Sequence, residues 1–457
     1  MNIDELKARL DELDKNTLQD FVLDLYLNYP ELSDTIESLV LANDPSALTK
    51  VINKRIQSIK RGRRFIDYHA SFSFARDLET IISDIERGLL DSSPKHAFEL
   101  TDKFLATAEN VINRVDDSAG VVGDVYRTAV LQWLLAAKSW GNEATDWVDS
   151  VYKLCQDTDD GVLDPLLPHS NILLTEEQLK QLAWRYESET RKAMKGKGDN
   201  NKTNWEAIKG SVALGSVAEA LQDPALYERS VLIHRPQPND MQKQDIIKMY
   251  LKFNRTEDAL RWLNTSWEKH FERDRQRLLE AAYEQNGDKE QLVHIRRQLY
   301  LGDQSYTSLE HYLELLDDDE KKVVKEQAIK EAEKGRNVSV SADLLLQLGE
   351  NESAQSLVVS RDTELAEMYY ENLRNLAKKL EKAHLLLAAT ACYRALLSDI
   401  LNSGRSKAYT HAARYYKKLQ SMAEGIQQFS PLPSHEKFME QLEKNHYRKY
   451  SFWDRVK

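Results

Sequence analysis

The chain has 457 residues, of which only 16 are glycine and 10 are proline, while 30% are charged and 41% are hydrophobic. This composition excludes a collagen-like chain, Pro/Gly-rich disorder and a disulfide scaffold, and it disfavours an all-β sandwich, which needs many turns. The net charge of −11 means that a polyanion could bind only at a local basic patch.

Helical periodicity begins at the N-terminus and covers almost the whole chain. Four apolar residues there recur at helical spacing: Ile3, Leu6, Leu10 and Leu13. Asp44 and Pro45 combine a capping acid with a proline at the first helical position, so a helix is expected from Pro45 to about Arg61, ending at Gly62. Further helices are expected at 18–28, 71–90, 95–115, 125–140, 143–156 and 176–193.

Residues 195–204 contain three lysines, two glycines and no apolar side chain. Such a segment is typical of a flexible linker. The sequence therefore predicts an N-terminal helical domain, 1–194, followed by a helical repeat domain with C-terminal capping helices, 205–457.

An internal repeat appears in the second half of the chain. Segment 249–263 matches segment 282–299 at an offset of 33 residues, which aligns Asn254 with Gly287, and a third copy at 344–358 places Gly349 at the same turn. A helix-turn-helix unit of this length is the tetratricopeptide (TPR) pattern, in which stacked helix pairs share one core. The predicted fold is all-α, with the N-terminal helical domain followed by a TPR-like α-solenoid.

Four segments carry a family resemblance: 59–89, 98–137, 241–300 and 406–456. They resemble an uncharacterised bacterial domain-of-unknown-function family, whose helical repeat region is similar to the region that follows SWIM-type zinc fingers. Such a finger needs a CxC pair with a further Cys and His, whereas Cys155 and Cys392 stand alone, so the resemblance implies no zinc finger here. It implies no particular activity either.

A basic cluster covers the end of the predicted helix 45–61 and the residues after it, and it precedes aromatic residues. Its members are Lys54, Arg55, Lys60, Arg61, Arg63, Arg64 and Tyr68, with Phe65 between them. One interpretation is an anion or nucleic-acid site, in which cations bind phosphates and the rings stack on bases. The other is a solvated helix C-terminus, where cations complement the helix dipole.

Two acidic turns, 116–124 and 157–164, offer oxygen ligands for a divalent cation, although neither follows the EF-hand order. Helix capping also explains them. Alternatively, Asp116 and Asp117 pair with the cluster Arg61–Arg64. The sequence contains no catalytic or nucleotide-binding motif, so we expect no cofactor and no metal site. The aromatic and basic tail 435–453 is either an interaction motif or a cap on the end of the solenoid.

The sequence as a whole favours a non-catalytic protein-interaction scaffold that binds a protein or peptide partner in a groove of the repeat domain. Its groove residues are expected to be Lys248, Tyr250, Lys252, Arg277, Glu280 and Glu284. The alternatives are a nucleic-acid-associated factor that uses the basic cluster and a helical enzyme with a metal site at the acidic turns. No apolar run approaches the length of a membrane span, and the charged N-terminus and two thiols in helical patterns indicate a reducing cytoplasm. The family resemblance implies that this cytoplasm is bacterial.

Overall fold

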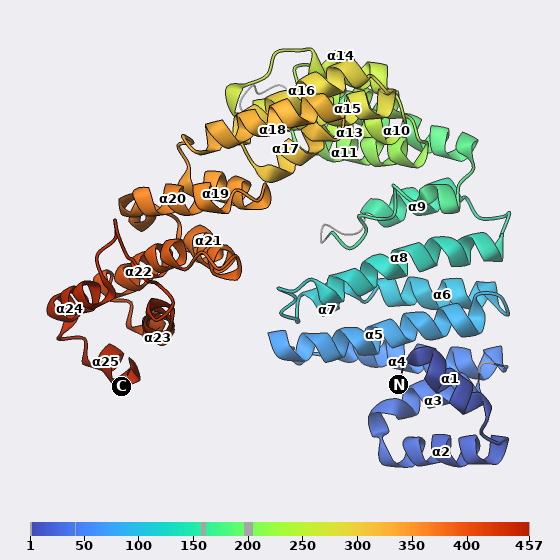
Figure 1. Cartoon of the computed structure of the whole chain (residues 1–457). Coiled ribbons are helices and arrows are strands. Elements are labelled where there is room, and N and C mark those ends of the chain that lie inside the picture. Colours follow the sequence, from blue (N-terminus) through green and yellow to red (C-terminus); the bar gives the residue numbers. More distant parts are fainter. Residues whose placement is uncertain (1, 42, 157–160, 196–203, 457) are drawn as a thin grey trace. The chain divides into compact units, whose positions relative to one another are not determined.

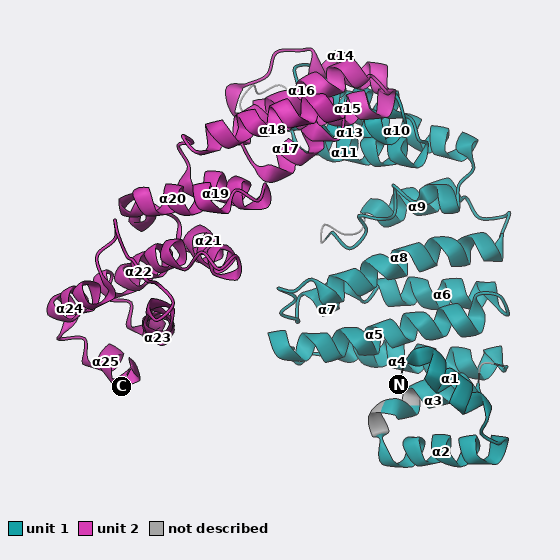
Figure 2. Cartoon of the chain, viewed as in Figure 1, with its two compact units in different colours: residues 1–255 teal, residues 256–457 magenta. Residues whose placement is uncertain are grey.

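The computed structural model describes residues 2–41, 43–156, 161–195 and 204–456. These residues form helices joined by loops (Figure 1), and the extended pairing among them is a single parallel bridge between Ile66 and Val115. The all-α prediction is therefore confirmed. Contacts divide the chain into two compact units, unit 1 at residues 1–255 and unit 2 at residues 256–457 (Figure 2).

Unit 1 contains thirteen α-helices and one short 3-10 helix among its described residues. They are α1 (Ile3–Asp11), α2 (Lys15–Asn28), α3 (Pro30–Val40), α4 (Pro45–Arg61), α5 (Tyr68–Leu89), α6 (Pro94–Leu105), α7 (Ala108–Ile112), α8 (Val121–Trp140), α9 (Trp147–Gln156), η1 (Ser170–Ile172), α10 (Glu176–Lys195), α11 (Trp205–Ala220), α12 (Pro224–His234) and α13 (Asp240–Lys252). Each helix packs mainly on those close to it in the chain, for example α4 on α5, α5 and α6 on α8, and α10 on α11.

Local sequence explains where these helices begin and end. Asp44 accepts a hydrogen bond from the Ala47 amide at 3.1 Å, and α4 runs from Pro45 to Arg61 as expected. The expected helix 95–115 is instead two helices, α6 and α7. They are separated at Thr107, whose buried hydroxyl bonds the Phe104 carbonyl at 2.6 Å and lies 2.7 Å from the hydroxyl of Tyr126.

Unit 2 continues the pattern with shorter helices. They are α14 (Thr256–Leu263), η2 (Lys269–Phe271), α15 (Glu272–Asn286), α16 (Lys289–Asp303), α17 (Tyr306–Leu313), α18 (Asp318–Ala332), α19 (Val338–Gln347), α20 (Asn351–Ser360), η3 (Asp362–Glu367), α21 (Tyr370–Lys382), α22 (Leu386–Asn402), η4 (Ser406–Ala408), α23 (Tyr409–Ala423), α24 (His435–His446) and α25 (Tyr450–Val456). First helices of successive pairs pack on one another, α17 on α19 and α19 on α21, and the second helix α20 packs on α22. This is the arrangement of an α-solenoid.

The predicted repeat length is visible in the helix positions. The first helices of successive pairs, α13, α15, α17, α19 and α21, begin at residues 240, 272, 306, 338 and 370, which are 32, 34, 32 and 32 residues apart. One helix pair therefore occupies about the 33 residues expected from the aligned segments.

The turns inside the pairs share one backbone geometry. Asn254, Gly287 and Gly349, which the sequence aligned, all have positive φ, and so do Gln222 and His384. After each of them, the next amide donates to the carbonyl five residues earlier, as in Arg255 to Tyr250 at 2.9 Å and Leu385 to Leu380 at 2.9 Å. This left-handed helix end recurs at five turns and starts each second helix in the same direction.

The predicted linker falls mostly outside the described residues, which exclude 196–203. The helices on either side of it, α10 and α11, pack on each other within unit 1. The compact units divide at 255/256, and the division into folding domains 1–194 and 205–457 stays a prediction.

Candidate functional site

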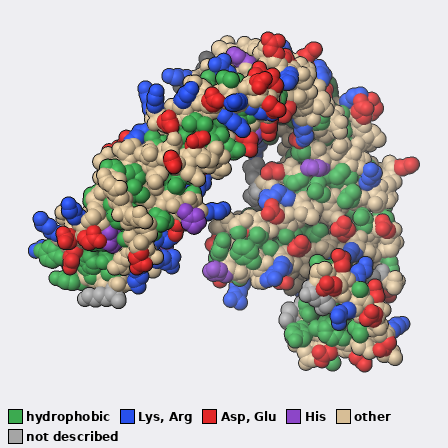
Figure 3. All heavy atoms as spheres, viewed as in Figure 1, with side chains coloured by type: hydrophobic (Ala, Val, Ile, Leu, Met, Phe, Trp, Pro, Cys, Tyr) green, Lys and Arg blue, Asp and Glu red, His purple; other side chains and the backbone are tan. Residues whose placement is uncertain are grey.

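The N-terminal helices leave apolar side chains exposed. Neither α1 nor α2 contains a buried residue, although α1 has its apolar residues on one side and α2 is rich in apolar residues. Figure 3 shows hydrophobic side chains gathered over α2 and α3. The exposed apolar side chains of residues 3–40, which together we call the apolar face, are Ile3, Leu6, Leu10, Leu13, Phe21, Leu23, Leu27, Leu32, Leu39 and Val40. An exposed apolar surface of this extent is typical of a protein-interaction site.

The basic cluster lies at the end of α4 and in the loop that leads to α5. Lys60, Arg61, Arg63 and Arg64 are exposed, as are Lys54 further up the helix and Tyr68 at the start of α5. Arg55 is different, because its side chain is 12% exposed and forms a 2.6 Å ion pair with Asp84, which is itself buried. Arg55 therefore holds α4 against α5 and leaves the other cations at the surface.

Two contacts hold the loop 62–67, and neither was predicted from the sequence. Arg114 donates from its guanidinium to the carbonyls of Ile59 and Arg64, each at 3.3 Å, and lies directly against Gly62. The bridge between Ile66 and Val115 fixes the far end of the loop, because the Ile66 amide donates to the Arg114 carbonyl at 2.9 Å. The loop therefore has a defined shape.

The acidic turn after this bridge caps a helix. Asp117 accepts hydrogen bonds from the amides of Val122 and Gly123 at 2.9 and 2.8 Å, and Asp116 accepts from the Ser118 hydroxyl at 2.5 Å. In the described part of the chain, no group of three potential His, Cys, Asp or Glu ligands comes together. The second acidic turn lies partly outside that part, because residues 157–160 are not described.

The residues expected to line a groove are divided between the two units. On α13 in unit 1, Tyr250 is buried and donates to Glu228 at 2.5 Å, while Lys252 pairs with Glu219 and Lys248 lies 4.0 Å from Asp245. Tyr250 therefore acts in packing.

On α15 in unit 2, two of the remaining members bind one buried cation. Arg296 of α16 donates to Glu280 at 2.9 Å, to Glu284 at 3.1 Å and to Glu314, the residue after α17, at 3.0 Å. Only 8% of its side chain is exposed, so this network joins α15, α16 and α17. Arg277 is exposed.

A second buried cation, Arg394 of α22, has unmet hydrogen-bonding capacity. It donates to the Pro433 carbonyl at 2.8 Å and stacks over the rings of Phe438 and Phe429, but its Nε and Nη2 atoms have no partner in the structure. Burial lowers the pKa of Arg394 to about 10, although Asp362 and Glu436 oppose the shift.

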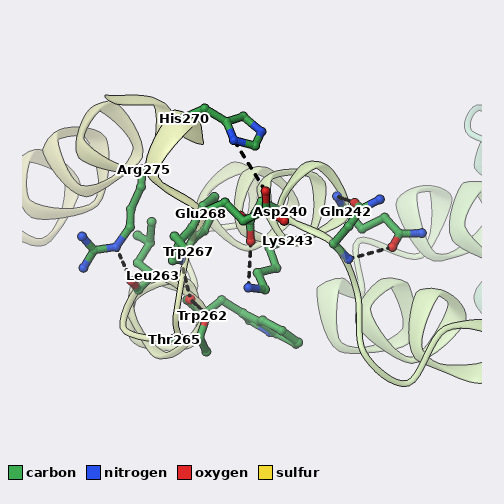
Figure 4. Close-up of polar contacts among 11 residues, drawn as sticks. Asp240, Gln242, Lys243, Trp262, Leu263, Thr265, Trp267, Glu268, His270 and Arg275 are labelled. Carbon is green, nitrogen blue, oxygen red and sulfur yellow. Dashed lines mark hydrogen bonds and ion pairs between the residues drawn. The ribbon is translucent and has the colours of Figure 1, made fainter. Parts of the chain in front are cut away.

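The connection from α14 to α15 is held by backbone acceptors (Figure 4). The Trp262 carbonyl accepts from the Thr265 hydroxyl at 2.7 Å and from the Trp267 indole at 3.4 Å, and Arg275 donates to the Leu263 carbonyl at 2.7 Å. These contacts order the longest connection between the early repeats without placing reactive groups together.

Both thiols are at least partly shielded from solvent, Cys155 inside unit 1 and Cys392 inside unit 2. Burial raises the pKa of Cys155 and raises that of Cys392 to about 12, so both stay protonated near neutral pH.

In the C-terminal tail, Phe452 is fully buried against Tyr409 and Tyr416, and Trp453 donates to the His446 carbonyl at 2.9 Å. These contacts bury the end of the tail, and its interpretation as a cap on the solenoid stays a prediction.

The fold and its surfaces define a helical repeat protein with an exposed apolar face and a separate basic loop. The chain matches a family of unknown function, DUF6880, over residues 7–455, and it belongs to that family. The predicted similarity to the region after SWIM-type zinc fingers stays a prediction.

Other comparisons add little. No curated protein matches the chain. Among solved structures, a circular tandem repeat protein with novel repeat topology and enhanced subunit contact surfaces is similar at 15% identity over 95% of each chain, but its TM-score is 0.15. A TM-score this low does not indicate a shared fold or function. None of the described helices is long and apolar enough to cross a membrane.

Proposed function

We propose that this protein is a non-catalytic interaction scaffold of a bacterial cytoplasm that binds a partner protein through the apolar face of α1–α3. The observation that carries the proposal is that α1 and α2 contain no buried residue while their apolar side chains are exposed. Isolated helices of 9 and 14 residues are marginal in water, because most helical stability comes from packing of the apolar face. A partner that covers this face would supply that packing.

Charge indicates the kind of partner. Residues 2–28 carry seven acidic and three basic side chains, so α1 and α2, which carry most of the apolar face, have a net negative charge. Two copies of the chain would bring like charges together, which disfavours self-association. A partner with an apolar helix flanked by lysine and arginine would complement both the apolar side chains and this negative charge.

The test is affinity capture from the native host with quantitative mass spectrometry, using the intact chain and the variant Leu10→Ser/Leu27→Ser. Both side chains are exposed, so the folded chain should keep its melting temperature. We expect the recovery of the main partner to fall at least tenfold. Val323→Ser on α18 removes an equally exposed apolar side chain elsewhere and should leave recovery unchanged.

Two results would contradict the proposal. One is equal recovery of every partner with the intact chain and the double variant. The other is a dimer mass for the purified chain, measured by light scattering, that the double variant converts to a monomer mass, because a second copy would then occupy the face. The expected groove along the repeats stays a prediction, and four of its six residues have exposed side chains: Lys248, Lys252, Arg277 and Glu284.

A further inference from the structure

Unpaired cations and exposed aromatic rings lie next to each other at the end of α4 and the start of α5. We call this set the basic–aromatic strip and define it as Lys60, Arg61, Arg63, Arg64, Phe65 and Tyr68. Its four cations are exposed, and none of them forms an ion pair with any described residue. Elsewhere exposed cations are commonly paired, as Lys180 is with Glu176 at 2.7 Å and Arg191 with Glu187 at 2.7 Å. In a chain with an excess of acids, four adjacent unpaired cations give this part of the surface a local positive charge that could attract an anion.

Exposed rings lie at the same end of unit 1. Phe65 is 64% exposed and Tyr68 is 41% exposed, although apolar rings of this size are normally buried. The Tyr68 ring meets Phe72, which is equally exposed, edge to face at 5.5 Å between centroids. These rings offer flat faces to a ligand directly after the last cation.

The strip is also rigid enough to bind without prior ordering. Arg114 holds the carbonyls of Ile59 and Arg64, and the bridge at Ile66 holds the backbone between the two rings. Because neighbouring side chains of an extended segment point to opposite sides, anchoring Ile66 toward the core turns Phe65 outward. The sequence identified the cations but not this support, which comes from a segment about 50 residues further along the chain.

We propose that the basic–aromatic strip binds single-stranded nucleic acid, with phosphates on the four cations and unstacked bases on Phe65 and Tyr68. Cations that follow a backbone and aromatic rings that stack on bases are the two parts of such sites. A duplex offers phosphates but hides the faces of its bases, and an acidic peptide has no bases to stack. This site is separate from the apolar face of the proposed function.

The experiment is fluorescence anisotropy of the full chain with a labelled oligothymidine of about 20 nucleotides, a matched duplex, polyglutamate and phosphatidylserine vesicles. We expect the single strand to bind most tightly. Four phosphate contacts give a slope of about −3 for log K against log salt concentration. Arg63→Ala/Arg64→Ala should make the slope shallower by about 1.4.

Phe65→Ala/Tyr68→Ala separates stacking from charge. We expect it to weaken binding of the single strand by tenfold or more while leaving the salt slope unchanged. The control for Arg63→Ala/Arg64→Ala is Lys180→Ala/Arg191→Ala, which also removes two exposed cations of unit 1. This control variant should bind the single strand as tightly as the intact chain does. Leu10→Ser/Leu27→Ser should also bind normally, which keeps this inference independent of the partner protein.

Four results would overturn the inference. They are no measurable binding of the single strand, equal or tighter binding of the duplex or polyglutamate, tighter binding of the vesicles, and an equal loss in the control variant and the strip variants. Circular dichroism of each variant is the check that it is folded, so that lost binding can be told apart from lost structure.

Discussion

Arg296 shows how one residue stabilises three consecutive helices. Its guanidinium binds Glu280, Glu284 and Glu314 and also donates to the His311 carbonyl at 2.9 Å. Arg296→Met removes these bonds and leaves three carboxylates together, so we expect the free energy of unfolding to fall by ~2 kcal/mol. Urea denaturation measures it, with the exposed Arg277→Met on α15 as the control. Equal stability of the two variants would show that the network contributes nothing.

Histidines give the C-terminal end of unit 2 a pH dependence. Burial lowers the pKa of His446, with Lys449 adding to the shift, and burial also lowers that of His435. Below the unfolded value of about 6.5, the unfolded chain takes up protons that the folded chain refuses, so stability present at pH 7 is lost as pH falls. Each histidine contributes at most ~1.4 kcal/mol per pH unit.

The measurement is the free energy of unfolding from pH 7 to 5 for the intact chain and for His446→Gln. The variant should have the flatter profile. His411→Gln on α23 is the control, because this histidine is exposed. If the profile of His446→Gln were as steep as that of the intact chain, His446 would not be a source of the acid sensitivity.

At the scale of the element, the recurring turn should tolerate glycine better than other residues. His384 has φ 59° and is exposed, so a side chain is held in a conformation that glycine adopts without strain. We expect His384→Gly to raise the free energy of unfolding by ~0.5–1 kcal/mol. Gly287→Ala should lower it by ~1 kcal/mol through the backbone alone, because a Cβ at Gly287 would meet no atom within 4 Å. Thermal unfolding of both variants measures the change in the free energy of unfolding. An increase for His384→Gly together with a decrease for Gly287→Ala is expected, and any other combination contradicts this explanation of the turns.

The same turns show what the sequence could and could not predict. Asn254, Gly287 and Gly349 are residues that favour positive φ, so the alignment found them, whereas Gln222 and His384 adopt the same conformation without any compositional signal. Helix class and the repeat length followed from periodicity, since that signal is local.

Long-range contacts could not be predicted in this way. The basic cluster was visible as charge, but the ion pair of Arg55 with Asp84 and the support from Arg114 join segments far apart in sequence. The burial of Tyr250 belongs to the same class, because position in a repeat gives the period but not which side of the helix is covered.

At the scale of the whole molecule, burial is distributed unevenly along the chain. Helices α8 and α22 each bury eleven residues, whereas α1 and α2 bury none. In a repeat protein each helix pair depends on its neighbours, so helices with few buried contacts open at low free energy. We expect hydrogen exchange of the free chain to be fastest in α1 and α2 and slowest in α8 and α22.

Hydrogen exchange also tests whether a partner protein covers the apolar face. Adding the captured partner should slow exchange in α1–α3, and leave α22 unchanged, because the partner would supply the packing that these helices lack. Leu10→Ser/Leu27→Ser should abolish that protection while exchange in α8 stays slow. A different result would contradict the partner proposal: α1 and α2 exchange slowly in the free chain, and their exchange becomes fast when the chain is diluted. A second copy of the chain would then cover these helices.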